Sequence, residues 1–110
     1  MEITLRGLIE EIKKIEGVKK VSVISRTGIP VNGDSYENQE TFAAMSAIIL
    51  GAAETAATSI SGVKKIIVFL ESGDILLILS VGKRGVLSIL STRDVTKDIE
   101  HLLDKFRYVI

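Results

Sequence analysis

Residues 41–63, TFAAMSAIILGAAETAATSISGV, decide the fold, because they predict a long helix that carries one charged residue, Glu54. At about 100° per residue, the larger apolar side chains gather on one side of this helix, which predicts contact with a core. That side comprises Phe42, Met45, Ile49, Ala52, Ala53, Ala56 and Ile60. The opposite side comprises Ala44, Ala47, Gly51, Glu54, Thr55 and Thr58. These residues are small and almost uncharged, so the helix is predicted to have a second packing partner.

Three other interpretations of this helix compete with a second partner. A membrane span requires about 20 strongly apolar residues, whereas this stretch mixes Ser, Thr, Glu and Gly with its Ala. A helix enclosed on every side needs more surrounding mass than a chain of 110 residues provides. An Ala-rich face can also lie exposed, because Ala is the best helix former. We favour a protein–protein contact, since charge is nearly absent along the whole stretch.

Length and composition predict a single domain spanning residues 1–110, with 46% hydrophobic and 25% charged residues. The 14 basic and 14 acidic residues cancel, so we expect neither nucleic-acid binding nor membrane insertion. The chain has no Cys, which excludes disulfides and thiolate chemistry, and its first residues form no apolar signal segment. We therefore expect a cytoplasmic protein.

Changes of hydrophobic period along the chain predict three helices and five strands. The predicted elements are a helix over 3–16, strands over 18–25 and 29–32, the long helix, strands over 66–70, 75–81 and 86–91, and a helix over 94–106. The long helix is expected to begin near Glu37 or Asn38, capped by Ser35 or Asn38. Thr92 or Asp94 is expected to cap the last helix. That helix is expected to bury Val95, Ile99, Leu102, Leu103 and Phe106.

The connections between these elements predict an α/β (α+β) fold with one antiparallel sheet. Short turns join the last three strands into a meander, and Pro30 places the second strand at a sheet edge because it has no N–H. The simplest sheet has the strand order 2-1-5-4-3. The long helix then covers one face, and the first and last helices cover the other.

In this order the third strand, Ile66–Leu70, is an edge that is apolar on both faces. Such an edge pairs readily with another strand, and a second copy related by a two-fold axis would satisfy its backbone groups. The same axis would bring the two small-faced helices together. We therefore predict a homodimer whose interface comprises Ala44, Ala47, Ile48, Gly51, Thr55, Thr58, Ile66, Ile67, Val68, Phe69 and Leu70.

The chain resembles the Roadblock/dynein light chain family from about Leu5 to Phe106. The resemblance rests on Gly17-Val18 before VSVISRTGIPV at 21–31, on the Ala-rich second helix, and on SILS at 88–91 before a polar helix cap. In the family, a helix-ending Gly precedes an apolar strand, an Asp/Arg-x-Gly type turn and a short apolar return. Ser25 departs from the pattern, because many members carry Asp before the turn, and this departure bears on turn stability.

The resemblance implies a profilin-like αββαβββα fold, and a homodimer joined through the third strands with paired second helices. Family members act as scaffolds or regulators of small Ras-like GTPases, and in prokaryotes the stand-alone domain often works with such a GTPase. The implied GTPase-partner surface comprises Ala43, Ala44, Ala47, Gly51, Glu54 and Thr58. No Arg lies in the long helix, so stimulation of hydrolysis would act by repositioning the GTPase's own groups.

Residues for catalysis are not apparent, so we expect no catalytic site, no metal and no cofactor. Gly82-Lys83-Arg84-Gly85 reads as a hairpin turn, and no phosphate-binding glycine motif is present. The one His, His101, falls on the polar side of the last helix, and no Ser has a base within predictable reach. Two alternatives remain: a profilin-, PAS- or GAF-like small-molecule sensor, and a structural scaffold subunit with no GTPase link. An apolar cavity of about 300 Å³ or more against the sheet would favour the sensor.

Overall fold

The computed structural model describes residues 4–106; Ile3, where we expected the first helix to begin, and the side chain of Phe106 lie outside the described residues. The elements are α1 (Leu5–Lys13), β1 (Val18–Ser25), β2 (Pro30–Gly33), α2 (Gln39–Ala56), β3 (Ile66–Phe69), β4 (Ile75–Val81), β5 (Gly85–Ser91) and α3 (Thr96–Phe106). The order of helices and strands agrees with the sequence prediction.

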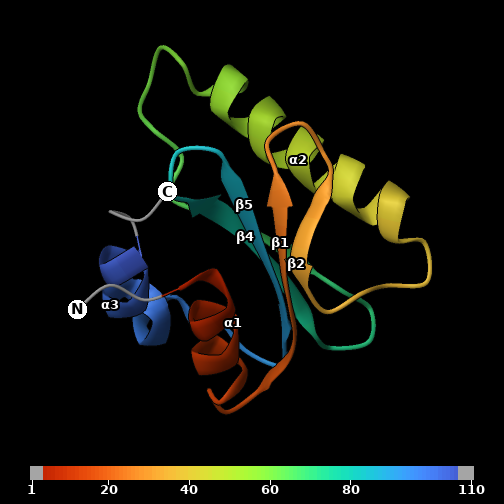
Figure 1. Ribbon diagram of the computed structural model, residues 1–110. Coiled ribbons are helices and arrows are strands. Elements are labelled where there is room, and N and C mark those ends of the chain that lie inside the picture. The colour runs from red at the N-terminus through yellow and green to blue at the C-terminus, as the bar shows by residue number, and fades with distance from the viewer. Residues whose placement is uncertain (1–3, 107–110) are drawn as a thin grey trace.

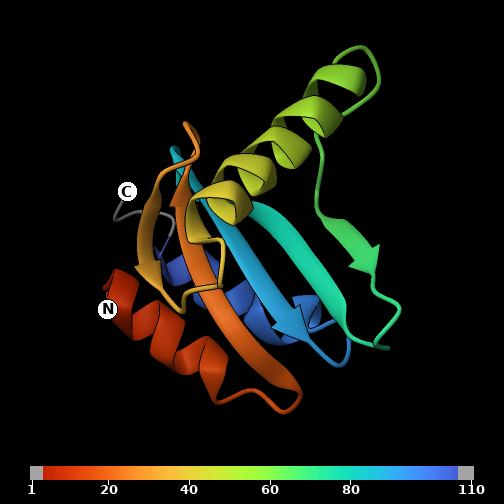
Figure 2. The ribbon, with the colours of Figure 1, turned by 90° about the vertical axis from the view of Figure 1, so that its right-hand side faces the viewer.

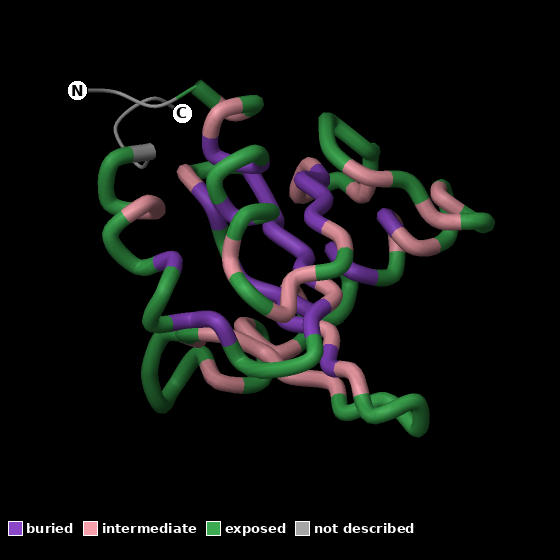
Figure 3. The backbone as a smooth tube through the Cα atoms, turned by 90° about the horizontal axis from the view of Figure 1, so that it is seen from below, coloured by how far each residue is buried: buried purple, intermediate pink, exposed green. Residues whose placement is uncertain are grey.

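The five strands form one antiparallel sheet in the order β2-β1-β5-β4-β3, as predicted (Figure 1). The central pairings place Ser22 of β1 opposite Ser88 of β5, and Leu77 of β4 opposite Ile89 of β5. Helices α1 and α3 lie on one face, and α2 crosses the other (Figures 1 and 2). The buried stretches gather along the strands between these layers (Figure 3). The prediction that β2 and β3 form the two edges of the sheet is therefore confirmed.

Two hydrophobic clusters fill the layers. The larger lies under α1 and α3 and combines Leu8 and Ile12 of α1 with strand residues such as Leu77 and Ile89, and with Ile99 of α3. The smaller lies under α2 and consists of Ile24, Ala43, Leu50, Ile78 and Val86. Alternate residues of β4 enter opposite clusters, which explains why this strand shows no hydrophobic alternation in the sequence.

The first and last helices begin with side-chain hydrogen bonds. Thr4 Oγ1 accepts the N–H of Gly7 over 3.0 Å, and Asp94 Oδ1 accepts the N–H of Thr96 over 2.9 Å. The first helix ends at Lys13, three residues before the predicted Glu16, because the chain turns there toward Gly17 at φ +96°. Left-handed backbone of this kind favours glycine. The last helix begins at Thr96, and Asp94 caps it from two residues earlier. Of the two predicted caps, Thr92 and Asp94, the structure therefore uses Asp94.

The long helix is shorter than predicted. It begins at Gln39 after Asn38, which is the N-cap residue but makes no side-chain cap bond, and it ends at Ala56 instead of Val63. Ser and Thr follow in residues 57–61, and their hydroxyls compete with helical backbone bonds. The C-terminal turns of α2 reach past the strands before the chain returns to β3 (Figure 2). Ile60, expected on the buried side, is 82% exposed in this connection.

Candidate interaction surface

Helix α2 faces the sheet with a different side from the predicted one. Its buried residues are Ala43, Ser46, Ala47 and Leu50. Their small side chains let the helix backbone approach the strands, and Leu50 fills the remaining space. The predicted orientation was wrong by roughly a third of a turn. Apolar side chains occur all around this helix, so periodicity alone does not select the side that is buried.

Large apolar side chains of α2 consequently point away from the sheet. Met45 is 47% exposed, Ile48 is 56% exposed and Ile49 is 36% exposed. We call the outward side the outer stripe, defined as Met45, Ile48, Ile49, Ala52 and Ala56, all of which are exposed. Its spacing of three, four and seven residues places these side chains along one line on the helix. Met45 and Ile49 were predicted to lie in the core, so this stripe corrects the prediction.

The opposite flank of α2 lies against the turn between β1 and β2. A Cβ atom added to Gly28 would lie 2.9 Å from the Cα of Ala44. The guanidinium of Arg26 forms two hydrogen bonds with Glu54, and one of them, from Nη2 to Oε2, spans 3.2 Å. Both side chains remain about one-third exposed. Ala44 and Glu54 of α2 therefore contact the chain's own hairpin.

The predicted site residues of α2 lie in different surroundings, some buried against the sheet and some beside the hairpin. Ala43 is fully buried and Ala47 is 8% exposed, so neither presents its side chain to a partner, contrary to the prediction. Ala44 and Glu54 face the β1–β2 turn, which lies at the opposite side of the sheet from β3. Gly51 lies seven residues after Ala44 and therefore on the same side of α2. Thr55 is exposed, three residues after Ala52 and seven after Ile48 of the outer stripe, and Thr58 follows the end of the helix. The predicted helix residues therefore do not form one surface.

The β3 edge carries exposed apolar residues within the described part of the chain. Ile66, Ile67 and Val68 are partly buried, Phe69 is 82% exposed and Leu70 is 37% exposed. β3 pairs with β4 on one side, and no strand of residues 4–106 pairs with its other side. An unpaired apolar edge is a template for another strand.

The β2 edge differs from the β3 edge because its outward backbone donors are blocked. Pro30 has no N–H, and the N–H of Gly33 donates to its neighbour Asn32 Oδ1 over 2.7 Å. The pairing of β2 with β1 also shifts register between Val23 and Ile24. Bulges, prolines and short strands are the usual protection of an exposed edge. The two edges of this sheet are therefore not equivalent for pairing with another chain.

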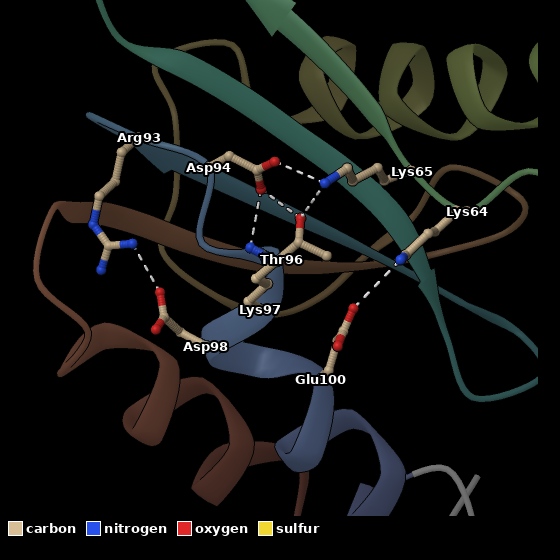
Figure 4. A pocket seen from close by; sticks show the side chains of 8 residues that line it. All are labelled: Lys64, Lys65, Arg93, Asp94, Thr96, Lys97, Asp98 and Glu100. Carbon is tan, nitrogen blue, oxygen red and sulfur yellow. Dashed lines mark hydrogen bonds and ion pairs between the residues drawn. The ribbon is translucent and has the colours of Figure 1, made fainter.

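A charged hollow of about 720 Å³ opens beside the start of α3 (Figure 4). It is lined by Lys64, Lys65, Arg93, Asp94, Thr96, Lys97, Asp98 and Glu100. Six of its charged residues form three ion pairs: Lys65 Nζ lies 2.7 Å from Asp94 Oδ2, Arg93 Nη1 lies 2.8 Å from Asp98 Oδ2, and Lys64 Nζ lies 3.4 Å from Glu100 Oε1.

The Asp94 carboxylate is the most strongly held group of this hollow. Burial raises its pKa, but hydrogen bonds from Lys65 and from Thr96 outweigh burial and lower the pKa to about 2. Lys65 Nζ also donates to Thr96 Oγ1 over 3.0 Å. The network ties the residue just before β3 to the first turn of α3.

Two features that would indicate other functions are missing from residues 4–106. No group of three or more His, Asp or Glu side chains in this part of the chain is arranged to hold a metal ion. None of its helices combines the length and apolarity that crossing a membrane requires.

Solved structures share this arrangement of an antiparallel sheet between one helix and two. The Roadblock/LC7 domain from Streptomyces avermitilis superposes with a TM-score of 0.75 at 16% identity, covering 94% of this chain and 92% of that one. MglB from Myxococcus xanthus gives a TM-score of 0.79 at 18% identity, with 93% and 90% covered. The gliding protein MglB from Thermus thermophilus gives 0.77 at 15% identity, with 93% and 84% covered. At these identities, the likeness establishes the fold.

The family follows from the sequence itself. The family model of the Roadblock/LC7 domain matches residues 5–91, which is most of the chain. The protein therefore belongs to the Roadblock/LC7 family, as the resemblance of its motifs indicated. Among curated protein sequences, none matches this chain.

Proposed function

We propose that this protein is a non-catalytic homodimeric interaction module that binds a small Ras-like GTPase and regulates or scaffolds it. The proposal combines membership of the Roadblock/LC7 family with two features of the surface. These features are the unprotected β3 edge and the outer stripe of α2. A cytoplasmic location and a single domain over residues 1–110 are part of the proposal.

The contrast between the two sheet edges is the observation that carries the homodimer. β2 is blocked by Pro30 and by the bond between Gly33 and Asn32, whereas β3 has no comparable protection. Pairing β3 with its counterpart in a second copy would satisfy its backbone groups and cover Phe69 and Leu70. The proposed dimer contact therefore retains Ile66–Leu70 from the sequence prediction. It leaves out the α2 residues that face the hairpin.

The outer stripe is the proposed GTPase surface. Met45, Ile48 and Ile49 are large apolar side chains exposed on a helix with no Lys or Arg, and such patches mark sites of protein contact. Gly51 and Glu54 lie at the edge of this surface, on the side of the hairpin, and Thr58 follows the end of the helix. Because α2 supplies no Arg, the proposed regulation acts by positioning groups of the GTPase.

The charged hollow bears on the sensor alternative. A small-molecule site is usually apolar with a few convergent polar groups. Here most of the polar groups are charged and form ion pairs, as Lys65 does with Asp94 and Arg93 does with Asp98. This lining favours an interaction module over a sensor.

The test is capture of a small Ras-like GTPase from native lysate by immobilised protein, after loading the lysate with a GTP analogue or with GDP. We expect wild type to retain a GTPase identified by mass spectrometry, and Ile48→Glu to lose it. His101→Glu, an exposed change on the other face of the sheet, is the matched control and should bind as wild type. Capture of other proteins without a GTPase would instead support the scaffold without a GTPase link.

A further inference from the structure

We propose that Asn32 is a site of spontaneous deamidation, in which the backbone nitrogen of Gly33 attacks the side-chain amide of Asn32 while the protein is folded. This inference concerns the β2 edge and depends neither on the proposed dimer nor on the proposed GTPase surface. Three observations carry it: the hydrogen bond between the two residues, the direction in which the Gly33 N–H points, and the exposure of β2.

The atoms that would react lie close together. The N–H of Gly33 donates to Asn32 Oδ1 over 2.7 Å. The amide carbon Cγ is bonded to Oδ1 at about 1.2 Å, so Cγ lies no more than about 4 Å from the attacking nitrogen. Atoms positioned for reaction are about 3–3.5 Å apart, so a modest rotation of the Asn32 side chain is enough to bring these two into reach.

The nitrogen of Gly33 takes no part in the bonding of β2 to β1. Asp34 N donates to Val21 O over 2.8 Å, directly beside the facing pair of Ser22 and Gly33. Hydrogen-bonded and non-hydrogen-bonded pairs alternate along an antiparallel ladder, so Gly33 directs its N–H away from β1. Attack by this nitrogen therefore breaks no hydrogen bond between the two strands.

The described part of the chain leaves this site open to water. All four residues of β2 are exposed, and β2 is an edge strand whose pairing with β1 shifts register. Gly33 also has no side chain to obstruct the approach of its nitrogen. Short, exposed segments with few buried contacts open locally at little cost in free energy, so the torsion angles that the reaction requires are accessible.

The reaction has two steps, and water and hydroxide are its only co-reactants. Hydroxide removes the Gly33 N–H proton, the nitrogen forms a bond to Asn32 Cγ, and the bond from Cγ to Nδ2 breaks, so that ammonia leaves with a proton from water. The product is a succinimide ring. Water then opens the ring by cleaving one of its two C–N bonds. Cleavage at Cγ leaves aspartate in a normal backbone, whereas cleavage at the backbone carbonyl carbon leaves isoaspartate.

Isoaspartate changes the backbone of β2. The chain then runs through the former side chain, which adds one carbon atom between positions 32 and 33. Asn32 faces Val23 and Gly33 faces Ser22, so the added atom disturbs the register of these pairs. Gly33 has no room to move toward β1, because a Cβ atom on it would lie 2.3 Å from Val21 O.

The anchor that follows Gly33 is the next feature affected. Asp34 Oδ2 accepts the N–H of Val21 over 3.0 Å, and Asp34 Oδ1 accepts a hydrogen bond from Lys13 Nζ over 2.9 Å. Ser22 Oγ donates to Asp34 O over 2.7 Å. These bonds hold the end of β2, where the loop to α2 begins. Isoaspartate is therefore expected to weaken the attachment of that loop.

Incubation of the folded protein at about pH 8 tests the site, with peptide mapping by mass spectrometry as the readout. We expect Asn32 to deamidate at least about tenfold faster than Asn38, the other Asn of the chain, because the side chain of Gln39 hinders attack by the nitrogen after Asn38. Asn32→Ser removes the amide and should prevent the acidic form that ion exchange separates. A rate at Asn32 no higher than that at Asn38 would overturn the assignment.

A parallel incubation in urea separates the effect of the folded structure from that of the Asn-Gly sequence. Since local opening of an exposed edge costs little free energy, Asn32 should deamidate in the folded protein within about tenfold of its rate in the unfolded chain. A lower rate in the folded protein would mean that the sheet protects the site, and the proposal would then be wrong.

The two products test the structural consequence. Asn32→Asp is the matched control, because it adds the same charge without lengthening the backbone. We expect this variant to unfold near the urea midpoint of wild type, and the isolated isoaspartate form to unfold at a lower urea concentration. Equal midpoints for the variant and the isoaspartate form would contradict the predicted disturbance of β2.

Discussion

Gly28 and Gly73 adopt nearly the same left-handed backbone but have different surroundings. Their φ angles are +86° and +97°. A Cβ on Gly28 would lie 2.9 Å from the backbone of Ala44, whereas a Cβ on Gly73 would meet nothing within 4 Å. Gly51, inside α2, also has open space at its Cβ position. Substitution of Gly28 would therefore cause both backbone strain and a clash with α2, substitution of Gly73 would cause strain alone, and substitution of Gly51 would cause neither.

Alanine at these positions is expected to give three different stabilities. Gly73→Ala should lower the free energy of unfolding by about 1 kcal/mol through backbone strain alone. Gly28→Ala should lower it by about 2 kcal/mol or more, because strain and the clash add. Gly51→Ala should raise it by about 0.5–1 kcal/mol, since Ala favours the helix. Urea unfolding followed by circular dichroism measures all three, and equal losses for Gly28→Ala and Gly73→Ala would contradict the close contact with α2.

Asp94 is the second feature at the residue scale, because its pKa is lowered to about 2 in the folded protein. The pKa of an unfolded Asp is about 3.9, so the folded state prefers the ionised form. This contribution is present above about pH 4 and is lost as the pH falls toward about 2. We expect wild type to lose more stability than Asp94→Asn over that interval. Unfolding midpoints in urea at pH 5, 4 and 3 check this, and parallel curves would exclude the role of Asp94.

At the scale of elements, most of the fold was predictable from the sequence. Pro30 marked β2 as an edge, the short turns imposed the antiparallel meander, and the hydrophobic periods located all eight elements. The orientation of α2 was not predictable, because Met45 and Ile49 on one side compete with Ala43 and Leu50 on another. Packing of small residues against the sheet decided between these sides, and packing cannot be read from one helix alone.

Two substitutions in α2 test that orientation. Leu50→Ala is expected to lower the free energy of unfolding by about 2–5 kcal/mol, because it removes a fully buried side chain. Ile48→Ala removes a similar side chain from the outer stripe and should change it by no more than about 0.5 kcal/mol. Both are measured by urea unfolding at the same protein concentration. A larger loss for Ile48→Ala than for Leu50→Ala would contradict the orientation.

At the scale of the whole molecule, the two sheet edges lead to opposite expectations. Wild type should have twice the 11.9 kDa mass of the chain in multi-angle light scattering at micromolar concentration. Phe69→Asp on the β3 edge should reduce the mass to that of one chain, because it places a charge in the proposed contact. Ile29→Asp changes an exposed residue just before the blocked edge strand β2 and should remain dimeric. A reduced mass for Ile29→Asp and not for Phe69→Asp would move the contact to the other edge.

The sequence alone determined the order of elements, the sheet topology, the family and the two strands that form the edges. These properties follow from local features, such as hydrophobic period, turn length and a proline without an N–H. Only the tertiary structure decided which side of α2 is exposed, that Ala44 and Glu54 face the chain's own hairpin, and which outward donors of β2 are occupied. Those properties depend on contacts between segments far apart in the chain, where side-chain size and backbone approach select one of several arrangements that the sequence pattern allows equally.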